Sequence, residues 1–299
     1  MVKKITILIP VFNEIFYTKK CLKNLNTVIT TYYKKKTKPS CFKIIIIDDG
    51  STDGTSDWVE RHYPEIKIIK GDGSLFWSKA INLGIEYSQQ LANISHILFW
   101  NKDLYVEDDY LSRLHDHISS EPSQVIIASK MYRKSTPKIL FSYGGLYNYN
   151  TGKKKNIGSG ELDCENYNHK MEIDWCGGMA VCIPFEVFNK IGGCDGSNFP
   201  QYDGDTDFFL RAKKAGFKLF VFPDLKAWNI HENTGKKTNF SLKSYLWHIN
   251  DIRSFQNFKI GFRLIKKHSQ GVLPYINLIL YYALFTIKYF TKILFSYFR

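Results

Sequence analysis

Carboxylate and amide side chains follow three apolar runs of the sequence. They are Glu14, after the run that ends at Val11; Asp48 and Asp49, after KIIII; and Asn101 and Asp103, after ILFW. In open parallel sheets, ligands bind outside the carboxyl ends of the strands. We therefore expect these side chains to line one ligand-binding cleft. Capping of the following helix is the alternative role for such residues, and we favour it only for Asp53.

Two partial motifs suggest other kinds of binding site. Residues from Asp49 to Glu60 match six positions of a calcium-binding EF-hand loop, but that loop must follow a helix and here it follows the strand-like KIIII. Gly71-Asp72-Gly73 begins like a dinucleotide-binding loop, but Phe76 occupies the position of the third glycine. The six cysteines form no CxxC pair. We expect neither an EF-hand, nor a dinucleotide site, nor a zinc site.

Short apolar runs alternate with helical patterns from Ile5 to about Asn239. KIIII is β-branched and apolar on both faces, which is typical of a central strand of a parallel sheet. The alternation predicts an α/β fold with a mostly parallel central sheet flanked by helices. The predicted strands are Ile5–Val11, Lys43–Ile47, Ile66–Ile69, Ile97–Trp100, Trp175–Pro184 and Lys218–Phe222. The predicted helices are Thr18–Thr30, Asp53–His62, Ser78–Gln90, Phe185–Ile191 and Asp205–Gly216, and Ser142–Gly160 reads as turns or a loop between short strands.

The positive charge is concentrated at the C-terminus. The 299 residues include 41 Lys and Arg against 28 Asp and Glu, which gives a net charge of +13. Residues Ile252–Arg299 contain no Asp or Glu and carry +8 of that charge. The α/β part is therefore only mildly basic, which argues against a nucleic-acid-binding protein.

An uncharged stretch of 17 residues, Gly271–Ile287, lies within this basic tail. It is short for a membrane span of ~20 residues, and Pro274 and Asn277 weaken that interpretation. Its basic flanks favour an amphipathic helix on an anionic membrane surface. A helical pair packed on the α/β part and a true span are the alternatives.

The chain is expected to divide into an α/β domain, residues 1–240, and a helical, membrane-associating segment, residues 241–299. The N-terminus has too short an apolar run for a secretory signal. We therefore expect a cytoplasmic protein, peripheral at the inner face of the plasma membrane, with free and mostly buried thiols.

An ordered set of motifs resembles the family-2 glycosyltransferases with the GT-A fold. The set comprises ITILIPVFNE, KIIIIDDGSTDGT, Asn101-x-Asp103, the glycine pairs at 177–178 and 192–193, and Tyr202–Gly216, which is similar to the family's E-D-x-D-x-x-x-R-x-x-x-x-G block. The resemblance covers roughly residues 4 to 235. Residues 73–84 also look like the rhamnosyltransferase-like branch of the family.

The resemblance implies donor-binding and metal-binding roles for individual residues. A divalent cation, Mn²⁺ or Mg²⁺, would be held by Asp103, and His231 is a further candidate ligand, with a core or surface histidine as the alternative. Asn101 replaces the first Asp of the family's D-x-D motif, so the site would carry less charge than usual. The donor-binding candidates are Pro10, Phe12, Glu14, Asp48, Asp49, Trp77, Asn101 and Lys102. Trp77 and Trp175 could each stack on a sugar or base, or be buried aromatics.

Asp205 corresponds to the catalytic base of the family. A carboxylate in that role takes a proton from the acceptor hydroxyl as it attacks the anomeric carbon. Gly204 replaces the usual Glu before this residue, and Asp203 and Asp207 are alternative candidates. Arg211 follows Asp207 by four residues, so that pair can form on one helix face and give Asp207 a structural role.

The resemblance implies an inverting glycosyltransferase of the hexosyltransferase class. It would move a sugar from a UDP- or dTDP-sugar to a hydroxyl of a glycan or lipid-linked acceptor in bacterial surface polysaccharide synthesis, such as lipopolysaccharide or capsule. The alternatives are a sugar-nucleotide-binding homologue without transferase activity and a nucleotidyltransferase. The second would need a glycine-rich phosphate loop near the N-terminus, and residues 10–18 contain no glycine.

Overall fold

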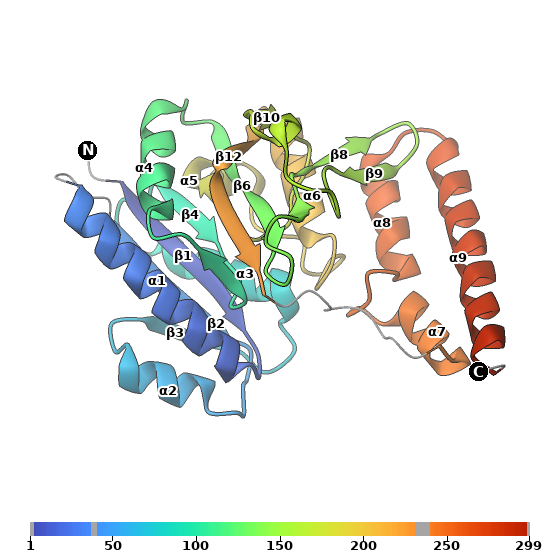
Figure 1. The fold of residues 1–299 in the computed structure, drawn as a ribbon, viewed down its shortest axis with the longest axis horizontal. Coiled ribbons are helices and arrows are strands. Elements are labelled where there is room, and N and C mark those ends of the chain that lie inside the picture. The colour runs from blue at the N-terminus through green and yellow to red at the C-terminus, as the bar shows by residue number, and fades with distance from the viewer. Residues whose placement is uncertain (1–2, 37–40, 231–239, 298–299) are drawn as a thin grey trace.

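The computed structural model describes residues 3–36, 41–230 and 240–297. It consists of an α/β domain and, after it in the chain, three helices that stand along one side of that domain (Figure 1). The sequence-predicted α/β fold with helices flanking a central sheet is confirmed.

The central sheet has ten strands. Its path runs β10-β12-β6-β11-β4-β1-β2-β3, with β5 paired to β12 and β7 paired to β6. The block β4-β1-β2-β3 is parallel, as is the pair β6 and β12, and the antiparallel strand β11 joins the two. The strands are β1 Lys4–Val11, β2 Cys41–Asp48, β3 Lys67–Lys70, β4 His96–Phe99, β5 Leu104–Val106, β6 Val125–Arg133, β7 Leu140–Ser142, β8 Gly145–Asn148, β9 Lys153–Asn156, β10 Met171–Glu172, β11 Val181–Pro184 and β12 Lys218–Asn229; β8 and β9 form a separate hairpin.

Helices cover both faces of the sheet, so its central strands are apolar on both sides. In β2, Ile46 packs into one core with the buried faces of α1 and α4, whereas Ile45 and Ile47 pack into the other core with α3, α5 and α6. Burial on both faces explains why KIIII is a continuous apolar run. The helices are α1 Ile15–Lys35, α2 Thr55–His62, α3 Phe76–Gln89, α4 Tyr110–Ser120, α5 Phe185–Ile191 and α6 Gly204–Lys214, with a 3₁₀ turn at Glu165–Tyr167.

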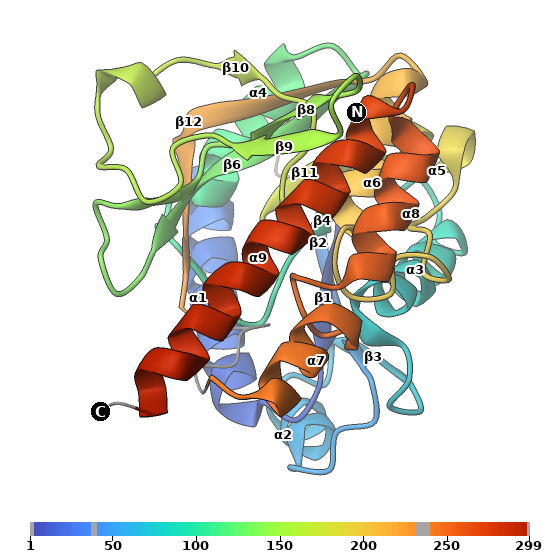
Figure 2. The ribbon, with the colours of Figure 1, turned by 90° about the vertical axis from the view of Figure 1, so that its right-hand side faces the viewer.

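The C-terminal helices are α7 Leu242–Asn250, α8 Phe258–His268 and α9 Leu273–Tyr297. Helix α8 packs between α6 and α9 (Figure 2). Its buried residues Ile260 and Leu264 form a small core with Phe199 and Leu210 of the α/β domain. The tail is therefore docked on the α/β domain through α8.

One predicted strand is much shorter than expected. The sequence predicted a strand over Trp175–Pro184, but the strand is Val181–Pro184, and Trp175 forms only an isolated β-bridge with Gly145. Ala180 has a positive φ of 53°, which breaks the strand conformation before Val181. Sequence reasoning also did not identify β6 and α4, which complete the sheet and one of its helical faces.

Candidate active site

Three strand ends meet at one edge of the sheet. Val11 at the end of β1 pairs with Asp48 at the end of β2, and Leu8 of β1 pairs with Phe99 at the end of β4. The antiparallel β11 begins at the same edge, since Val181 pairs with Phe99. The edge predicted from the sequence thus also receives the loop that precedes β11.

Two contacts connect the candidate donor-binding residues across this edge. The Lys102 Nζ lies 3.2 Å from Glu14 Oε2, so the segments after β4 and β1 form an ion pair. The Trp77 indole N–H donates to Asn101 Oδ1 at 3.3 Å. Glu14, Trp77, Asn101 and Lys102 therefore lie close together although they are up to 88 residues apart in sequence.

The carboxylates of Asp48 and Asp49 are buried and hold the loops around them. Asp48 accepts hydrogen bonds from the Ser51 backbone N–H at 2.8 Å and from the Ser56 hydroxyl. Asp49 accepts from the backbone N–H groups of Gly73, Leu75 and Phe76, at 2.8 to 3.2 Å, where the loop meets the start of α3. Asp49 thus fixes the start of α3, which carries Trp77.

Asp53 does not occupy the N-cap position of α2, which is Gly54, but its carboxylate binds the first turns of two helices. Its Oδ1 accepts from the Thr55 backbone N–H at 3.1 Å, at the first turn of α2, and its Oδ2 accepts from the Ile15 backbone N–H at 2.8 Å, at the first turn of α1. Burial raises the pKa of Asp53, but the hydrogen bonds from the Thr55 hydroxyl and from the Ile15 and Thr55 N–H groups outweigh it and lower the pKa below its ordinary value. The side chain therefore joins the starts of two helices.

Pro10 and Phe12 frame the end of β1. Pro10 pairs with Ile47 of β2 and is partly exposed. The Phe12 side chain is 50% exposed and lies just beyond the strand. An apolar ring left this exposed beside the strand ends is available to contact a bound planar group.

Asp103 is buried between β4 and β5, immediately before Leu104, with 6% of its surface exposed. Its backbone carbonyl accepts from the Ile230 N–H at 2.8 Å, which brings the end of β12 to the site. His231, the other candidate metal ligand, lies outside the described residues. Among those described, no group of three His, Cys, Asp or Glu side chains is arranged to hold a metal ion.

Asp205 lies at the start of α6 and points to the loop before β11. Its Oδ2 accepts from the Gly178 backbone N–H at 3.0 Å, and its Oδ1 accepts from the Thr206 N–H at 2.7 Å. Burial, followed by the nearby Asp203 carboxylate, raises the pKa of Asp205. A raised pKa increases the proton affinity of a general base.

The neighbouring acids Asp203 and Asp207 are engaged differently. Asp203 forms an ion pair with Lys154 of β9. Asp207 is fully buried, and its carboxylate contacts Arg211, Lys267 and His268, each at 2.8 Å. The sequence-predicted pairing of Asp207 with Arg211 is confirmed. Of the three acids, Asp205 is the one without a cationic partner among the ion pairs of the described residues.

The glycosyl transferase family 2 model matches residues 6–176, more than half of the chain. The chain belongs to this family. This glycosyltransferase is 24% identical to the rhamnosyltransferase WbbL of Escherichia coli K12 over 241 residues, which are 78% of this chain and 85% of WbbL. It is 21% identical to the glycosyltransferase GlyG of Streptococcus pneumoniae serotype 4 over 81% of this chain and 76% of GlyG. The expected likeness to the rhamnosyltransferase-like branch agrees with the first match.

Solved glycosyltransferase structures share the fold of this family-2 member. The crystal structure of GalNAc-T7 with UDP, GalNAc and Mn²⁺ superposes with a TM-score of 0.59 at 15% identity, over 80% of this chain and 45% of that chain. The mannosyltransferase PcManGT from Pyrobaculum calidifontis, in complex with GDP-Man and Mn²⁺, gives 0.56 at 13% identity, over 92% and 67%. The expected GT-A fold is confirmed.

Two features of the glycosyltransferase site were not identified from sequence. Lys154 lies in a three-lysine run that reads as a loop, and nothing local indicates that it reaches Asp203. The second feature is backbone strain: Asn13, Phe76, Ala180 and Asp203, all at the site, have positive φ of 47° to 60°. Strained backbone of this kind concentrates at functional sites.

Proposed function

We propose that this enzyme is an inverting glycosyltransferase that moves a sugar from a UDP- or dTDP-sugar to a hydroxyl of a glycan or lipid-linked acceptor in bacterial surface polysaccharide synthesis. The observation that carries the proposal is Asp205, a carboxylate of raised pKa at the sheet edge where the donor-binding candidates converge. Two structural neighbours were crystallised with UDP or GDP-Man, which supports a nucleoside diphosphate donor.

The proposed reaction is a single displacement. The acceptor oxygen forms a bond to the anomeric carbon while the bond from that carbon to the diphosphate oxygen breaks, and the hydroxyl proton passes to the Asp205 carboxylate. Attack opposite the leaving group inverts the anomeric centre. The nucleoside diphosphate leaves with the bonding electron pair.

The donor-binding roles remain those expected from the resemblance. Asp49 and Asp48 would contact the nucleoside, in a pocket lined by Pro10, Phe12 and Glu14. Trp77 would contact the sugar or base from the side opposite Gly178, because a Cβ at Gly178 would meet the Trp77 ring at 2.1 Å. Asn101 and Lys102 would lie beside the diphosphate.

A divalent cation fits the residues present. Asp103 offers one buried carboxylate, and Mg²⁺ or Mn²⁺ commonly takes only one or two protein carboxylates and completes its shell with phosphate oxygens. Asp103 would hold the ion, with His231 as a further candidate. When bound, the cation would offset the charge that develops on the leaving diphosphate.

The decisive experiment is a donor panel. Purified protein is incubated with Mn²⁺ or Mg²⁺ and a series of UDP-, dTDP- and GDP-sugars, and nucleotide release is measured with and without a membrane lipid extract. We expect release with one donor class, stimulated by the extract and abolished by EDTA. If no donor in the panel is bound or releases its nucleotide, the proposed transferase activity is contradicted.

The rate should depend on the ionisation of Asp205. Because a base must be ionised to accept a proton, we expect kcat/KM to rise with pH through an apparent pKa above that of an ordinary aspartate. The Asp203 carboxylate raises and the Lys154 ammonium lowers the pKa of Asp205. Asp203→Asn should therefore move the rise of kcat/KM, the acid limb of the pH profile, to lower pH. Lys154→Gln should move it to higher pH. A pH profile in which neither variant moves the limb would contradict the assignment.

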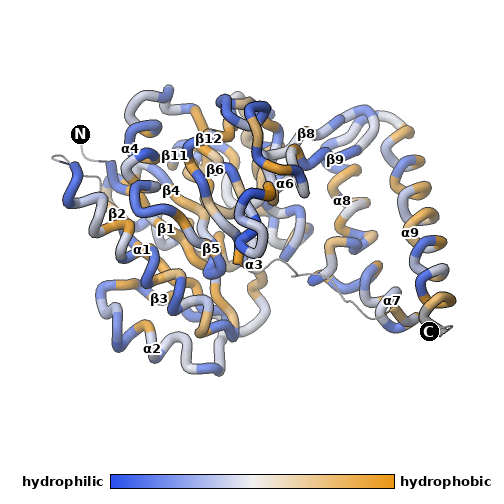
Figure 3. The backbone as a smooth tube through the Cα atoms, in the orientation of Figure 1, coloured by the Kyte–Doolittle hydropathy of each residue, from blue (hydrophilic) through white to orange (hydrophobic). Residues whose placement is uncertain are grey.

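We also propose that the chain divides at residues 240 and 241 into a catalytic domain and a membrane-associating segment. Helix α9, whose hydropathy Figure 3 shows, supports this, because Leu273–Phe295 is long and apolar enough to cross a bilayer. Only 11% of its most apolar window is buried. A stripe of exposed apolar side chains runs along it at helical spacing: Ile276, Leu280, Leu284, Ile287 and Leu294. With Lys288 and Lys292, this surface fits an anionic membrane at the inner face of the plasma membrane.

The stripe makes a specific prediction for membrane binding. Leu280→Glu/Leu284→Glu should weaken binding to anionic vesicles by about 10²-fold or more, since burial of each leucine contributes ~1.5–3 kcal/mol. Both side chains are more than half exposed, so folding should be unaffected. The matched control is Leu146→Glu/Leu162→Glu, which adds the same charge to exposed positions of the α/β domain. Equal vesicle binding by the two double variants would refute the role of α9.

A further inference from the structure

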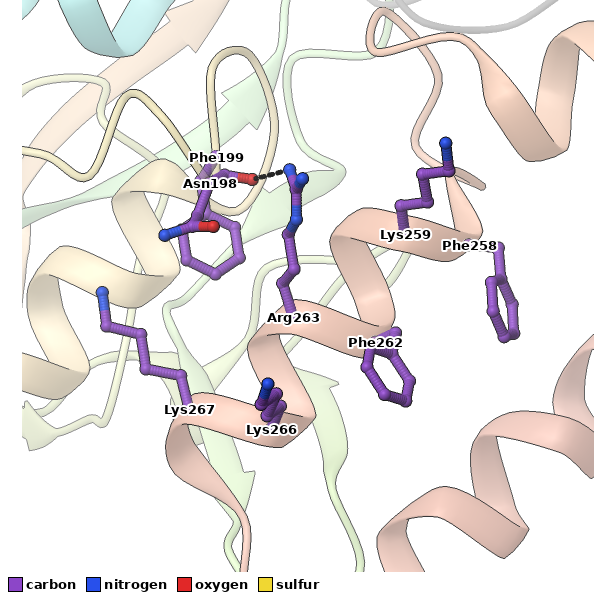
Figure 4. A pocket seen from close by; sticks show the side chains of 8 residues that line it. All are labelled: Asn198, Phe199, Phe258, Lys259, Phe262, Arg263, Lys266 and Lys267. Carbon is purple, nitrogen blue, oxygen red and sulfur yellow. Dashed lines mark hydrogen bonds between the residues drawn. The ribbon is translucent and has the colours of Figure 1, made fainter.

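An open groove of about 560 Å³ lies between helix α8 and the segment that leads into α6. Its walls are Asn198 and Phe199 on one side and α8 residues on the other (Figure 4). None of the candidate donor-binding residues lines it. The groove is thus separate from the strand ends at which the nucleotide is expected.

Four cations from α8 line the groove. Lys259, Arg263, Lys266 and Lys267 recur at helical spacing, so they share one side of the helix. Arg263 donates to the Asn198 carbonyl at 3.1 Å, and Lys267 forms ion pairs with Asp195 and Asp207. Lys259 and Lys266 form no ion pair within residues 3–36, 41–230 and 240–297. The groove therefore presents a surplus of positive charge to a ligand.

Two aromatic residues of α8, Phe258 and Phe262, also line the groove and adjoin α9. Phe258 contacts the Tyr282 ring at 5.0 Å, and Phe262 contacts the Tyr275 ring at 5.7 Å. Figure 4 shows both phenylalanines pointing away from Asn198 and Lys267. Helix α9 therefore packs beside the cationic groove and carries its exposed apolar stripe on the side turned away from α8. The groove and the stripe together match a ligand with an anionic head and a long apolar chain.

One wall residue of the groove, Phe199, lies against the start of α6, which carries Asp205. The Phe199 carbonyl accepts from the Ser78 hydroxyl, and a Cβ at Gly204 would lie 2.9 Å from that carbonyl oxygen. Gly204 immediately precedes Asp205 at the start of α6. A ligand seated in the groove would thus lie along the segment that positions the proposed base.

We propose that this groove binds the phosphate or diphosphate of a lipid-linked acceptor, with Lys259, Arg263 and Lys266 contacting the phosphate oxygens and the lipid chain lying along α9. The proposal rests on the proposed function, since it supplies the acceptor of that reaction. The ammonium groups of lysine and the guanidinium group of arginine bind phosphate through charge-assisted hydrogen bonds.

Binding can be tested without any transfer reaction. Neutral phosphatidylcholine vesicles are doped either with a long-chain isoprenyl diphosphate or with phosphatidylglycerol at matched negative charge, and inorganic diphosphate serves as a soluble competitor. Co-sedimentation is measured for the wild type and for Lys259→Gln/Lys266→Gln. The control is Lys214→Gln/Lys218→Gln, which removes two charges from exposed positions outside the groove and outside α9.

We expect the wild type to bind isoprenyl diphosphate vesicles about tenfold or more tightly than phosphatidylglycerol vesicles, because a phosphodiester offers fewer charged oxygens to Lys259 and Lys266 than a diphosphate does. The groove variant should lose that preference and the control should retain it. Equal binding to both vesicles would show a general anionic surface and overturn the proposal. Inorganic diphosphate that binds as tightly as the lipid form, or a preference that survives in the groove variant, would also overturn it. Because no donor is used, these results are independent of the donor panel.

Discussion

Asp205→Asn is expected to lower kcat for sugar transfer by roughly 10²–10⁴-fold, which is the usual contribution of a positioned general base. The substitution keeps the shape of the side chain but removes the group that accepts the proton. Of the two backbone hydrogen bonds that Asp205 accepts, from Gly178 and Thr206, the amide can retain one. The donor KM should therefore change little, and the loss should appear in kcat measured by product formation.

The two neighbouring acids provide controls for this prediction. Asp203→Asn should retain most of the activity at pH values where Asp205 is already ionised, because its side chain pairs with Lys154. Its left-handed backbone is also well tolerated by asparagine. If Asp205→Asn transferred sugar at the wild-type rate while Asp203→Asn did not, Asp203 would be the base.

Asp207→Asn is expected to lower the free energy of unfolding by about 3–5 kcal/mol, because it removes a fully buried carboxylate and leaves the partly buried Arg211 and Lys267 without that partner. The Asp207 carboxylate is fully buried and contacts Arg211 within α6 and Lys267 and His268 from α8. The substitution should loosen α8 from the α/β domain as well as destabilise α6. Urea unfolding monitored by circular dichroism would measure the loss. The control is Asp116→Asn, which breaks an ion pair with Lys36 at a mostly exposed position and should have little effect.

The stability of the protein at acid pH should depend on the same cluster of Asp207, Arg211, Lys267 and His268. His268, Arg211 and Lys267 offset the cost of burial and lower the pKa of Asp207 to about 2, below the ordinary value of 3.8. A depressed pKa contributes stability that is present above about pH 4 and is lost as the pH falls toward about 2. The shift corresponds to about 2 kcal/mol. The stability of Asp207→Asn should fall less steeply than that of the wild type over this interval, and parallel curves would contradict the buried ion cluster.

Local patterns predicted the elements that form one continuous apolar run or one helical stripe. KIIII became β2, and the predicted helix over Ser78–Gln90 became α3, because each pattern matches burial on fixed faces. The predicted strand was longer than β11 because Trp175–Val181 is as apolar as a strand. The positive φ of Ala180, which ends the strand at Val181, is set by the packing of the site and has no local sequence signal. Helix α4 and strand β6 lie in a part of the sequence where no pattern was identified.

The sequence by itself determined which chemistry is present: carboxylates after strands, an ordered set of family motifs, and a basic tail without acids. Only the tertiary structure decided how the acids near α6 differ. Asp203, Asp205 and Asp207 alternate within five residues at the start of α6. Yet Asp203 pairs with a lysine from β9, Asp205 accepts from the Gly178 backbone, and Asp207 is buried against α8. The physical reason is that a pKa depends on burial and on charges brought from distant segments, and these are set by packing. The same packing pairs Lys267 of the tail with Asp207, so that this charge holds α8 on the α/β domain. It leaves Lys259 and Lys266 facing the groove.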